Sequence, residues 1–159
     1  MDGLFQKILV PIDGSRSANN ALTHALQLAK IHGSFIEVMH VMTVTEDLPT
    51  NLVKSEKTDT PSEWVEEYLT QIRVKDENML SEALEEAKKM GLEGKTASKL
   101  LIGRPGDVIL SEAAQGTFDL IVIGNRGLSG LKEFVLGSVS HQIVDESKIP
   151  VLVVKGISE

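Results

Sequence analysis

Short apolar runs alternate along the chain with segments whose apolar residues recur every three to four positions. The runs are short and bounded by turn residues, as is typical of buried strands, and they lie at residues 7–12, 35–42, 96–102, 118–123 and 151–155. Helical spacing governs the segments between them, including residues 138–145. The pattern predicts the order β-α-β-α-β-α-β-α-β.

Residues at the ends of these segments match helix termini. Ser15 or Ser17 stands where an N-cap is expected, and Gly33 stands where the same helix should end. A second, long helix is predicted to end near Gly91, and a third to follow the turn at 103–107. Each helix therefore has a defined place between two strands.

The segment 43–61 breaks this alternation. It is polar, contains two prolines and carries mixed charge. Loops of this length are usually functional or mobile, and covering a bound ligand is one hypothesis for it. No repeat or low-complexity tract is present, so we expect a single domain over residues 1–159.

Alternating strands and helices indicate an α/β fold with a parallel sheet and helices on both faces. Ligands of such sheets bind beyond the carboxyl ends of the strands, where the strand order reverses. Residues that directly follow a strand are therefore the candidates for a binding site.

Composition narrows the function. The net charge is −7 and no Lys/Arg cluster stands out, which argues against a nucleic-acid surface but not against a phosphate ligand. The sequence contains no run of 18 apolar residues of the kind that spans a membrane. The first ten residues do not resemble a secretory signal. The chain has no cysteine, which excludes disulfides and thiolate metal sites. We expect a cytoplasmic protein.

A glycine-rich stretch, GNRGLSGLKEFVLGSV at residues 124–139, follows the fourth predicted strand and leads into a helix. Glycines let a backbone approach a ligand closely. Exposed amides, together with the helix N-terminus at 137–138, would form an anion cradle, to which Ser138 adds a hydroxyl. The alternative interpretation is a surface loop closed by Ser138 as N-cap. The dinucleotide fingerprint Gly-x-Gly-x-x-Gly is absent from the chain.

The spacing Gly124-x2-Gly127-x9-Gly137-Ser138 resembles the ATP-binding pattern Gly-x2-Gly-x9-Gly-Ser/Thr of the universal stress protein family. Further segments are similar to the family in the same order, and together they cover almost the whole chain: KILVPIDGS, VMHV, GRPGDVIL, FDLIVIGNRG and IPVLVVK. The resemblance implies an open five-stranded parallel sheet of order 3-2-1-4-5, Rossmann-like and related to the adenine-nucleotide hydrolases. It also implies a homodimer formed through the C-terminal edge strand, residues 150–155, whose apolar character suits pairing with a second chain.

The resemblance also implies a set of nucleotide-binding residues. In the motif that begins at Gly124, the residues expected to surround the phosphates and ribose are Gly127, Gly130, Gly137, Ser138 and Val139. Asp13 is expected near the adenosine and the main chain of Val41 at the adenine edge, with Pro11 and Ile12 lining the same pocket. Arg126 occupies a variable position of the motif, so its contact with phosphate is a hypothesis.

Two residue types have competing interpretations. Asp13 fits an Asp-Gly turn before a helix, and equally a ligand contact at the ribose or base end, because a carboxylate would repel a triphosphate. The four histidines share no metal-ligand spacing, and His40, within an apolar strand, is expected to be a hydrogen-bonded core residue. A divalent ion, Mg²⁺ or Mn²⁺, would then be held through the phosphates.

Three functions remain open. The leading hypothesis is an ATP-binding regulatory protein of a stress response with at most slow hydrolysis, because no acidic metal ligand or general base accompanies the cradle. The second is an enzyme such as an ATP pyrophosphatase, whose Ser-Gly-Gly-x-Asp-Ser loop is replaced here by residues 13–17, DGSRS. The third is a dimeric partner platform that binds no nucleotide.

Overall fold

The computed structural model describes residues 3–43, 63–126 and 135–156. The predicted loop from residue 44 onward, and the motif glycines Gly127 and Gly130, lie outside the described residues.

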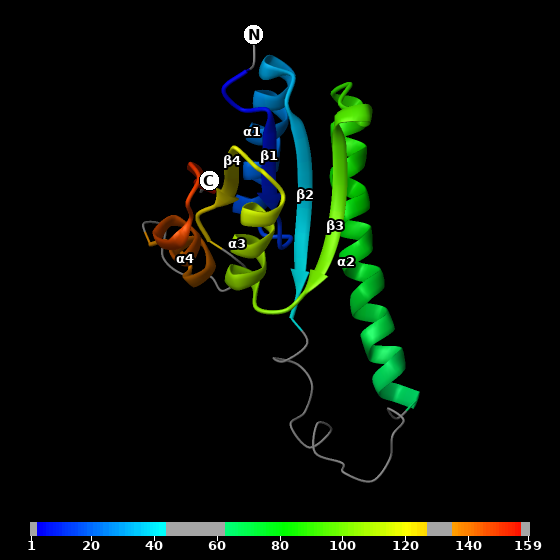
Figure 1. The fold of residues 1–159 in the computed structure, drawn as a ribbon. Coiled ribbons are helices and arrows are strands. Elements are labelled where there is room, and N and C mark those ends of the chain that lie inside the picture. The colour runs from blue at the N-terminus through cyan, green and yellow to red at the C-terminus, as the bar shows by residue number, and fades with distance from the viewer. Residues whose placement is uncertain (1–2, 44–62, 127–134, 157–159) are drawn as a thin grey trace.

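Five parallel strands form a single sheet of order β3-β2-β1-β4-β5, which confirms the predicted topology (Figure 1). The elements in chain order are β1 (Lys7–Pro11), α1 (Arg16–His32), β2 (Phe35–Met42), α2 (Glu63–Lys89), the 3₁₀ turn η1 (Glu93–Lys95), β3 (Thr96–Ile102), α3 (Pro105–Gln115), β4 (Leu120–Gly124), α4 (Ser138–Glu146) and β5 (Val151–Val154).

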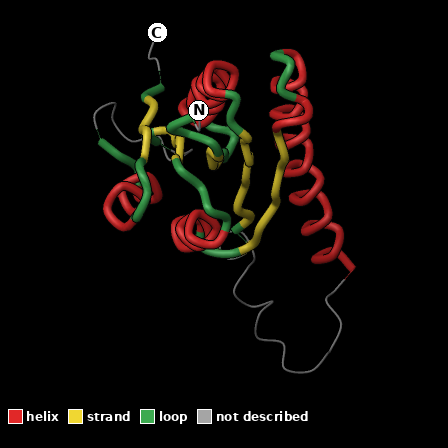
Figure 2. Tube along the Cα trace, turned by 45° about the horizontal axis from the view of Figure 1, so that its top comes forward, coloured by secondary structure: helices red, strands yellow, loops and turns green. Residues whose placement is uncertain are grey.

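Helices cover both faces of the sheet, as the alternation predicts (Figure 2). On one face, α1 and α2 pack against β1, β2 and β4 through an apolar core that includes Ile8, Val10, Leu22, Leu26, Val38 and Leu80. On the other face, α3 and α4 enclose Leu9, Met39, Ile109, Phe118, Ile121 and Ile143. Successive residues of β1 serve opposite cores because side chains alternate along a strand.

The termini of α1 show how local sequence sets a helix boundary. Ser15, not Ser17, is the N-cap, and its Oγ accepts the N–H of Ala18 at 3.2 Å. At the other end Gly33 has φ +70°, and its N–H donates to the carbonyl of Ala29 at 2.8 Å. Ser17 is thereby left available for a contact outside the helix.

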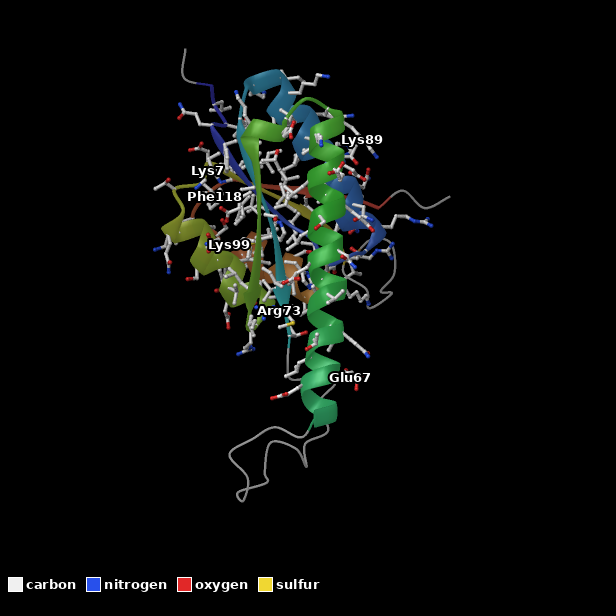
Figure 3. All side chains as sticks on the ribbon, turned by 90° about the vertical axis from the view of Figure 1, so that its right-hand side faces the viewer. Lys7, Glu67, Arg73, Lys89, Lys99 and Phe118 are labelled. Carbon is white, nitrogen blue, oxygen red and sulfur yellow. The ribbon has the colours of Figure 1, made fainter. Side chains whose placement is uncertain are left out.

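The long helix α2 runs beside β3, and its first turns project beyond the sheet (Figures 1 and 3). Charged side chains, including Glu67, Arg73 and Lys89, cover its solvent side. Asp76 differs, because it is only 8% exposed and faces the body of the protein.

The fourth strand begins two residues later than predicted, at Leu120 instead of residue 118. Asp119 lies directly before this strand, and its Oδ2 accepts the backbone N–H groups of Gln6 and Lys7, both at 2.8 Å. The Asp119 N–H also donates to the Lys7 carbonyl at 2.9 Å, so both the backbone and the side chain of Asp119 attach this segment to β1.

Candidate ligand-binding pocket

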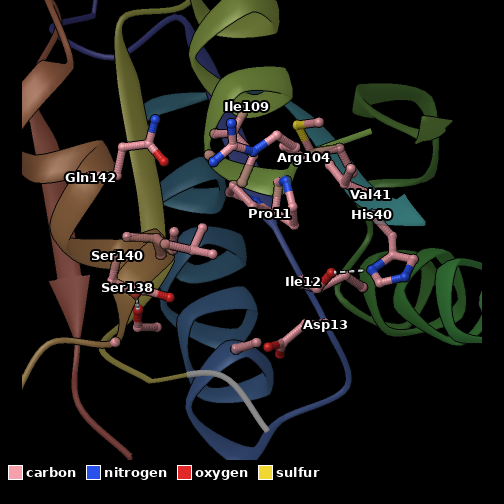
Figure 4. A pocket seen from close by; sticks show the side chains of 18 of the residues that line it. Pro11, Ile12, Asp13, His40, Val41, Arg104, Ile109, Ser138, Ser140 and Gln142 are labelled. Atoms are coloured by element: carbon pink, nitrogen blue, oxygen red, sulfur yellow. Dashed lines mark hydrogen bonds between the residues drawn. The ribbon is translucent and has the colours of Figure 1, made fainter. Parts of the chain in front are cut away.

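A pocket of about 890 Å³ opens at the carboxyl ends of β1, β2 and β4, against the first turns of α3 and α4 (Figure 4). The sheet order reverses between β1 and β4, so the pocket lies at the switch point where ligands of such folds bind. The nine sequence-predicted site residues that the structure describes all line this pocket: Pro11, Ile12, Asp13, Val41, Gly124, Arg126, Gly137, Ser138 and Val139.

The first turn of α4 supplies backbone donors to the pocket. Gly137 is the N-cap residue, with φ −62° and ψ 163°, and within the described part of the chain no side chain caps this helix. The N–H groups of the first helical residues, Ser138, Val139 and Ser140, have no intrahelical acceptor. Together with the helix dipole they favour an anion at this end.

Asn125 anchors the exit of β4. It is 5% exposed, its N–H donates to the Val154 carbonyl at 2.9 Å, and its Oδ1 accepts the N–H of Gly156 at 3.1 Å. Its carbonyl accepts the N–H of Gly137 at 2.8 Å. These bonds join the start of the glycine-rich stretch to its end, so that the first turn of α4 stands beside the exit of β4.

Two serines hold the backbone of Arg126 against α1. The Arg126 carbonyl accepts the hydroxyl of Ser17 at 2.7 Å and that of Ser15 at 3.2 Å, and the Arg126 N–H lies 3.2 Å from Ser17 Oγ. The α1 N-terminus thereby fixes the path of the chain as it leaves β4.

Gly124 is required by packing as well as by the motif. A Cβ at this position would lie 2.7 Å from the carbonyl carbon of Ser17 and 2.8 Å from the nitrogen of Ala18. The Gly124 carbonyl also accepts the hydroxyl of Ser140 at 2.7 Å. The first glycine of the motif therefore lets β4 approach α1 closely, a role that sequence reasoning did not identify.

Asp13 takes part in the turn that one interpretation of the sequence predicted. Its Oδ1 accepts the N–H of Ser15 at 2.9 Å, and Gly14 between them has φ +82°. The same side chain lines the pocket, where a carboxylate has further lone pairs to offer. The turn and a ligand contact are therefore compatible.

Sequence reasoning missed the wall formed by α3. Gly103, Arg104 and Gly106 line the pocket together with Gln142 of α4, whose Nε2 donates to Asp107 at 2.9 Å. A Cβ on Gly106 would lie 2.5 Å from the Gln142 amide carbon, so a larger residue here would displace the Gln142 side chain. The turn GRPGD, placed directly after a strand, is the sequence feature that could have revealed this wall.

A charged cluster lies on the α3 side of the sheet. Lys99 Nζ is 2.6 Å from Glu112 Oε1, and this hydrogen bond lowers the pKa of Glu112 and raises that of Lys99. Burial raises the pKa of Glu37 above its ordinary value of 4.5, and the neighbouring Glu112 raises it further. Glu37 Oε1 is buried without a hydrogen-bond partner among the described residues.

His40 is hydrogen-bonded, as expected for a histidine in an apolar strand. Its Nδ1 lies 2.7 Å from the Ile12 carbonyl oxygen. Among the described residues, no three His, Cys, Asp or Glu side chains gather as metal ligands. Within the same residues, no helix combines the length and apolar character needed to cross a membrane.

Comparisons with known proteins agree with this architecture. Residues 4–155 match the family model described as the universal stress protein family. Universal stress protein YxiE of Bacillus subtilis is 36% identical over 155 residues, covering 96% of this chain and 100% of YxiE.

Solved structures share the fold. MJ0577 of Methanocaldococcus jannaschii has a TM-score of 0.79 and 27% identity, over 98% of this chain and 99% of that one. A universal stress protein in complex with cAMP has a TM-score of 0.66 and 26% identity, over 96% and 98% of the two chains.

Proposed function

The chain belongs to the universal stress protein family, and from this premise we propose that it binds ATP in the pocket and acts as a nucleotide-dependent regulatory protein of a stress response. The observation that carries the proposal is the convergence of the α4 N-terminus with the carboxyl ends of β1 and β4 in one pocket. The cAMP complex of a related protein supports an adenine nucleotide as the ligand class.

The chemistry of the pocket orients the nucleotide. The phosphates belong at residues 137–139, where backbone N–H groups and the helix dipole favour negative charge. Asp13 stands apart from Ser138 in Figure 4 and belongs at the ribose or base end, because its carboxylate would repel the phosphates. Val41, 7% exposed and at the end of β2, belongs at the adenine edge. Gly124 and Arg126 line the same pocket, and the proposed site also includes Gly127 and Gly130.

A divalent ion, Mg²⁺ or Mn²⁺, would reach the site bound to the phosphates. Mg²⁺ often binds through substrate phosphates and keeps several waters. Ser138, which is exposed and lines the pocket, is the hydroxyl best placed to meet such an ion.

Hydrolysis in this pocket should be slow. Asp13 is the single acidic side chain among the described residues that line it, and one of its oxygens already accepts the Ser15 N–H. Phosphoryl transfer needs a positioned water or nucleophile and neutralisation of the phosphate charge. We expect turnover far below the value of about 10 per second that is ordinary for enzymes.

Calorimetric titration of nucleotide-free protein with ATP and Mg²⁺ tests the proposal, and nucleotide analysis of the denatured purified protein complements it. Saturable binding with one site per chain is expected. If no heat of binding or retained nucleotide is detected, ATP binding is wrong. Steady-state hydrolysis near 10 per second would instead favour the enzyme.

Gly137→Val tests the cradle itself. At φ −62° and ψ 163° valine is free of backbone strain, so the fold should persist while the side chain fills the anion site. Gly94→Val is the matched control, because a Cβ at Gly94 meets nothing within 4 Å. Loss of ATP binding in the first variant alone is expected. Equal affinities would place the phosphates elsewhere.

We also propose a homodimer through β5. Within the described residues, this strand pairs only with β4, and its Leu152 is 39% exposed. An apolar edge strand invites pairing with a second chain. Leu152→Lys should shift the protein toward monomer in sedimentation or light-scattering measurements, whereas Val74→Lys on the exposed side of α2 should not. A monomeric wild type, or a Leu152→Lys variant that remains fully dimeric, would contradict this interface.

A further inference from the structure

His40 of β2 lies between the exit of β1 and helix α2. From its position in β2, its Nδ1 lies 2.7 Å from the Ile12 carbonyl oxygen, and its Nε2 lies 3.4 Å from Oδ1 of Asp76 in α2. The His40 and Asp76 side chains are 14% and 11% exposed. Figure 4 shows the ring turned toward Ile12, directly after the end of β1.

The chemistry of the partners assigns the contacts. A carbonyl oxygen only accepts, so Nδ1 of His40 is the donor to Ile12. This leaves Nε2 as the ring nitrogen that faces the Asp76 carboxylate, at 3.4 Å. Asp76 is 8% exposed, and burial of a carboxylate is costly unless it has a polar partner, which His40 provides here.

The bond to His40 completes the attachment of Ile12 to β2. The Ile12 N–H donates to the Met39 carbonyl at 2.8 Å, so both backbone groups of Ile12 are held by consecutive residues of β2. The next residue along the chain is Asp13, which lines the pocket.

A second contact from α2 reaches the same turn. A Cβ on Gly14 would lie 3.4 Å from the Met79 sulfur, which places Met79 against the turn. Met79 is three residues after Asp76 and therefore on the same side of the helix. Helix α2 thus supports the turn at residues 12–15 directly through Met79 and indirectly through Asp76 and His40.

We propose that His40 and Asp76 are a positioning pair for the pocket. His40 holds the Ile12 carbonyl, and with it the backbone that carries Asp13, while Asp76 orients His40 and couples α2 to the site. The affinity arm of the test rests on the proposed nucleotide binding. The spectroscopic arm uses ligand-free protein, so the failure of one inference is distinguishable from the failure of the other.

Two amide variants of His40 separate its contact with Ile12 from its contact with Asp76. In His40→Asn the amide nitrogen stands near the place of Nδ1, so the bond to Ile12 is retained. In His40→Gln it stands near the place of Nε2, so the bond to Ile12 is lost. We expect His40→Gln to weaken ATP binding roughly tenfold, because the Ile12 carbonyl oxygen loses the donor that His40 Nδ1 provides. His40→Asn should recover most of this loss. In ligand-free protein the ¹³C shift of the Ile12 carbonyl should change in the Gln variant and stay close to wild type in the Asn variant.

Asp76→Ala and Glu77→Ala compare the same truncation at neighbouring positions of α2. Glu77 is exposed, its carboxylate lies 3.5 Å from Arg73, and it is not among the described residues that line the pocket. Asp76→Ala should weaken ATP binding several-fold and shift the Ile12 carbonyl signal, while Glu77→Ala changes neither.

The positioning role is overturned if His40→Asn and His40→Gln have equal affinities and equal Ile12 shifts, or if Asp76→Ala behaves like Glu77→Ala. A wild-type protein that binds no ATP would refute the proposed function, and the carbonyl shifts would still decide whether the pair positions the turn.

Discussion

Replacing Gly124 by alanine tests whether the first motif glycine serves the fold independently of any ligand. The added Cβ would lie 2.7 Å and 2.8 Å from two backbone atoms of α1. Favourable contacts between carbon atoms lie at about 3.5–4.0 Å. The strand and the helix would therefore have to separate by roughly 0.7 Å or more.

That separation cannot be absorbed by a flexible side chain. The nearest obstructing atom is the Ser17 hydroxyl oxygen, and the next two are backbone atoms of Ser17 and Ala18, which cannot rotate away. Both β4 and α1 belong to the buried core. Overpacking of this kind costs about 1–3 kcal/mol, and we expect the upper half of that range. For a chain of this length, a loss of about 2 kcal/mol lowers the melting temperature by roughly 4–8 °C.

Urea unfolding of nucleotide-free protein measures the effect. Gly94→Ala is the control, because its Cβ would meet nothing within 4 Å. We expect Gly124→Ala to lower the unfolding midpoint without changing the slope. Gly94→Ala should leave the free energy of unfolding within about 0.5 kcal/mol of wild type. Equal midpoints for the two variants would refute the packing argument and leave the glycine with a ligand-related role alone.

Three further variants test other contacts. Because the folded-state pKa of Glu37 is raised above 4.5, the folded protein binds more protons and loses stability as pH rises through this region. Glu37→Gln removes that loss and the repulsion by Glu112. Thermal melts should therefore show the variant to be more stable than wild type at pH 7, with the gain vanishing at acid pH; a gain independent of pH would contradict this. Ser17→Ala should speed hydrogen exchange of the Arg126 amide, because the hydroxyl that holds this backbone is lost; unchanged exchange would mean that other contacts suffice. Gly33→Ala should cost about 1 kcal/mol in urea unfolding, because its φ of +70° is unfavourable for alanine, and a neutral result would show that the helix end relaxes.

Much of the site followed from local sequence. A strand followed by a turn and a helix places the residues after Pro11 and Gly124 at the same edge of a parallel sheet, whichever side chains fill the core. The glycine motif then selected individual residues between 124 and 139, and the described ones line the pocket with Asp13 and Val41: Gly124, Arg126, Gly137, Ser138 and Val139. Periodicity sufficed here because it reports which face of an element is buried.

The partners of polar side chains did not follow in the same way. The Ser17 hydroxyl donates a hydrogen bond to the carbonyl of Arg126, a residue 109 positions away in the sequence. The periodicity of apolar residues gives no reason to connect the two. Glu37 and Asp76 look like ordinary charged residues in the sequence, although one faces Glu112 and the other His40. Such pairs depend on which elements become neighbours.

The sequence by itself determined the strand and helix order, the parallel sheet, and the place of the pocket at its carboxyl edge, because these depend on local periodicity and on residues at element ends. Only the tertiary structure decided why Gly124 must lack a side chain, which hydroxyls hold Arg126, and how α2 reaches the pocket wall through His40. The physical reason is that close packing and hydrogen bonding act between atoms brought together by the fold, at separations that no linear pattern encodes.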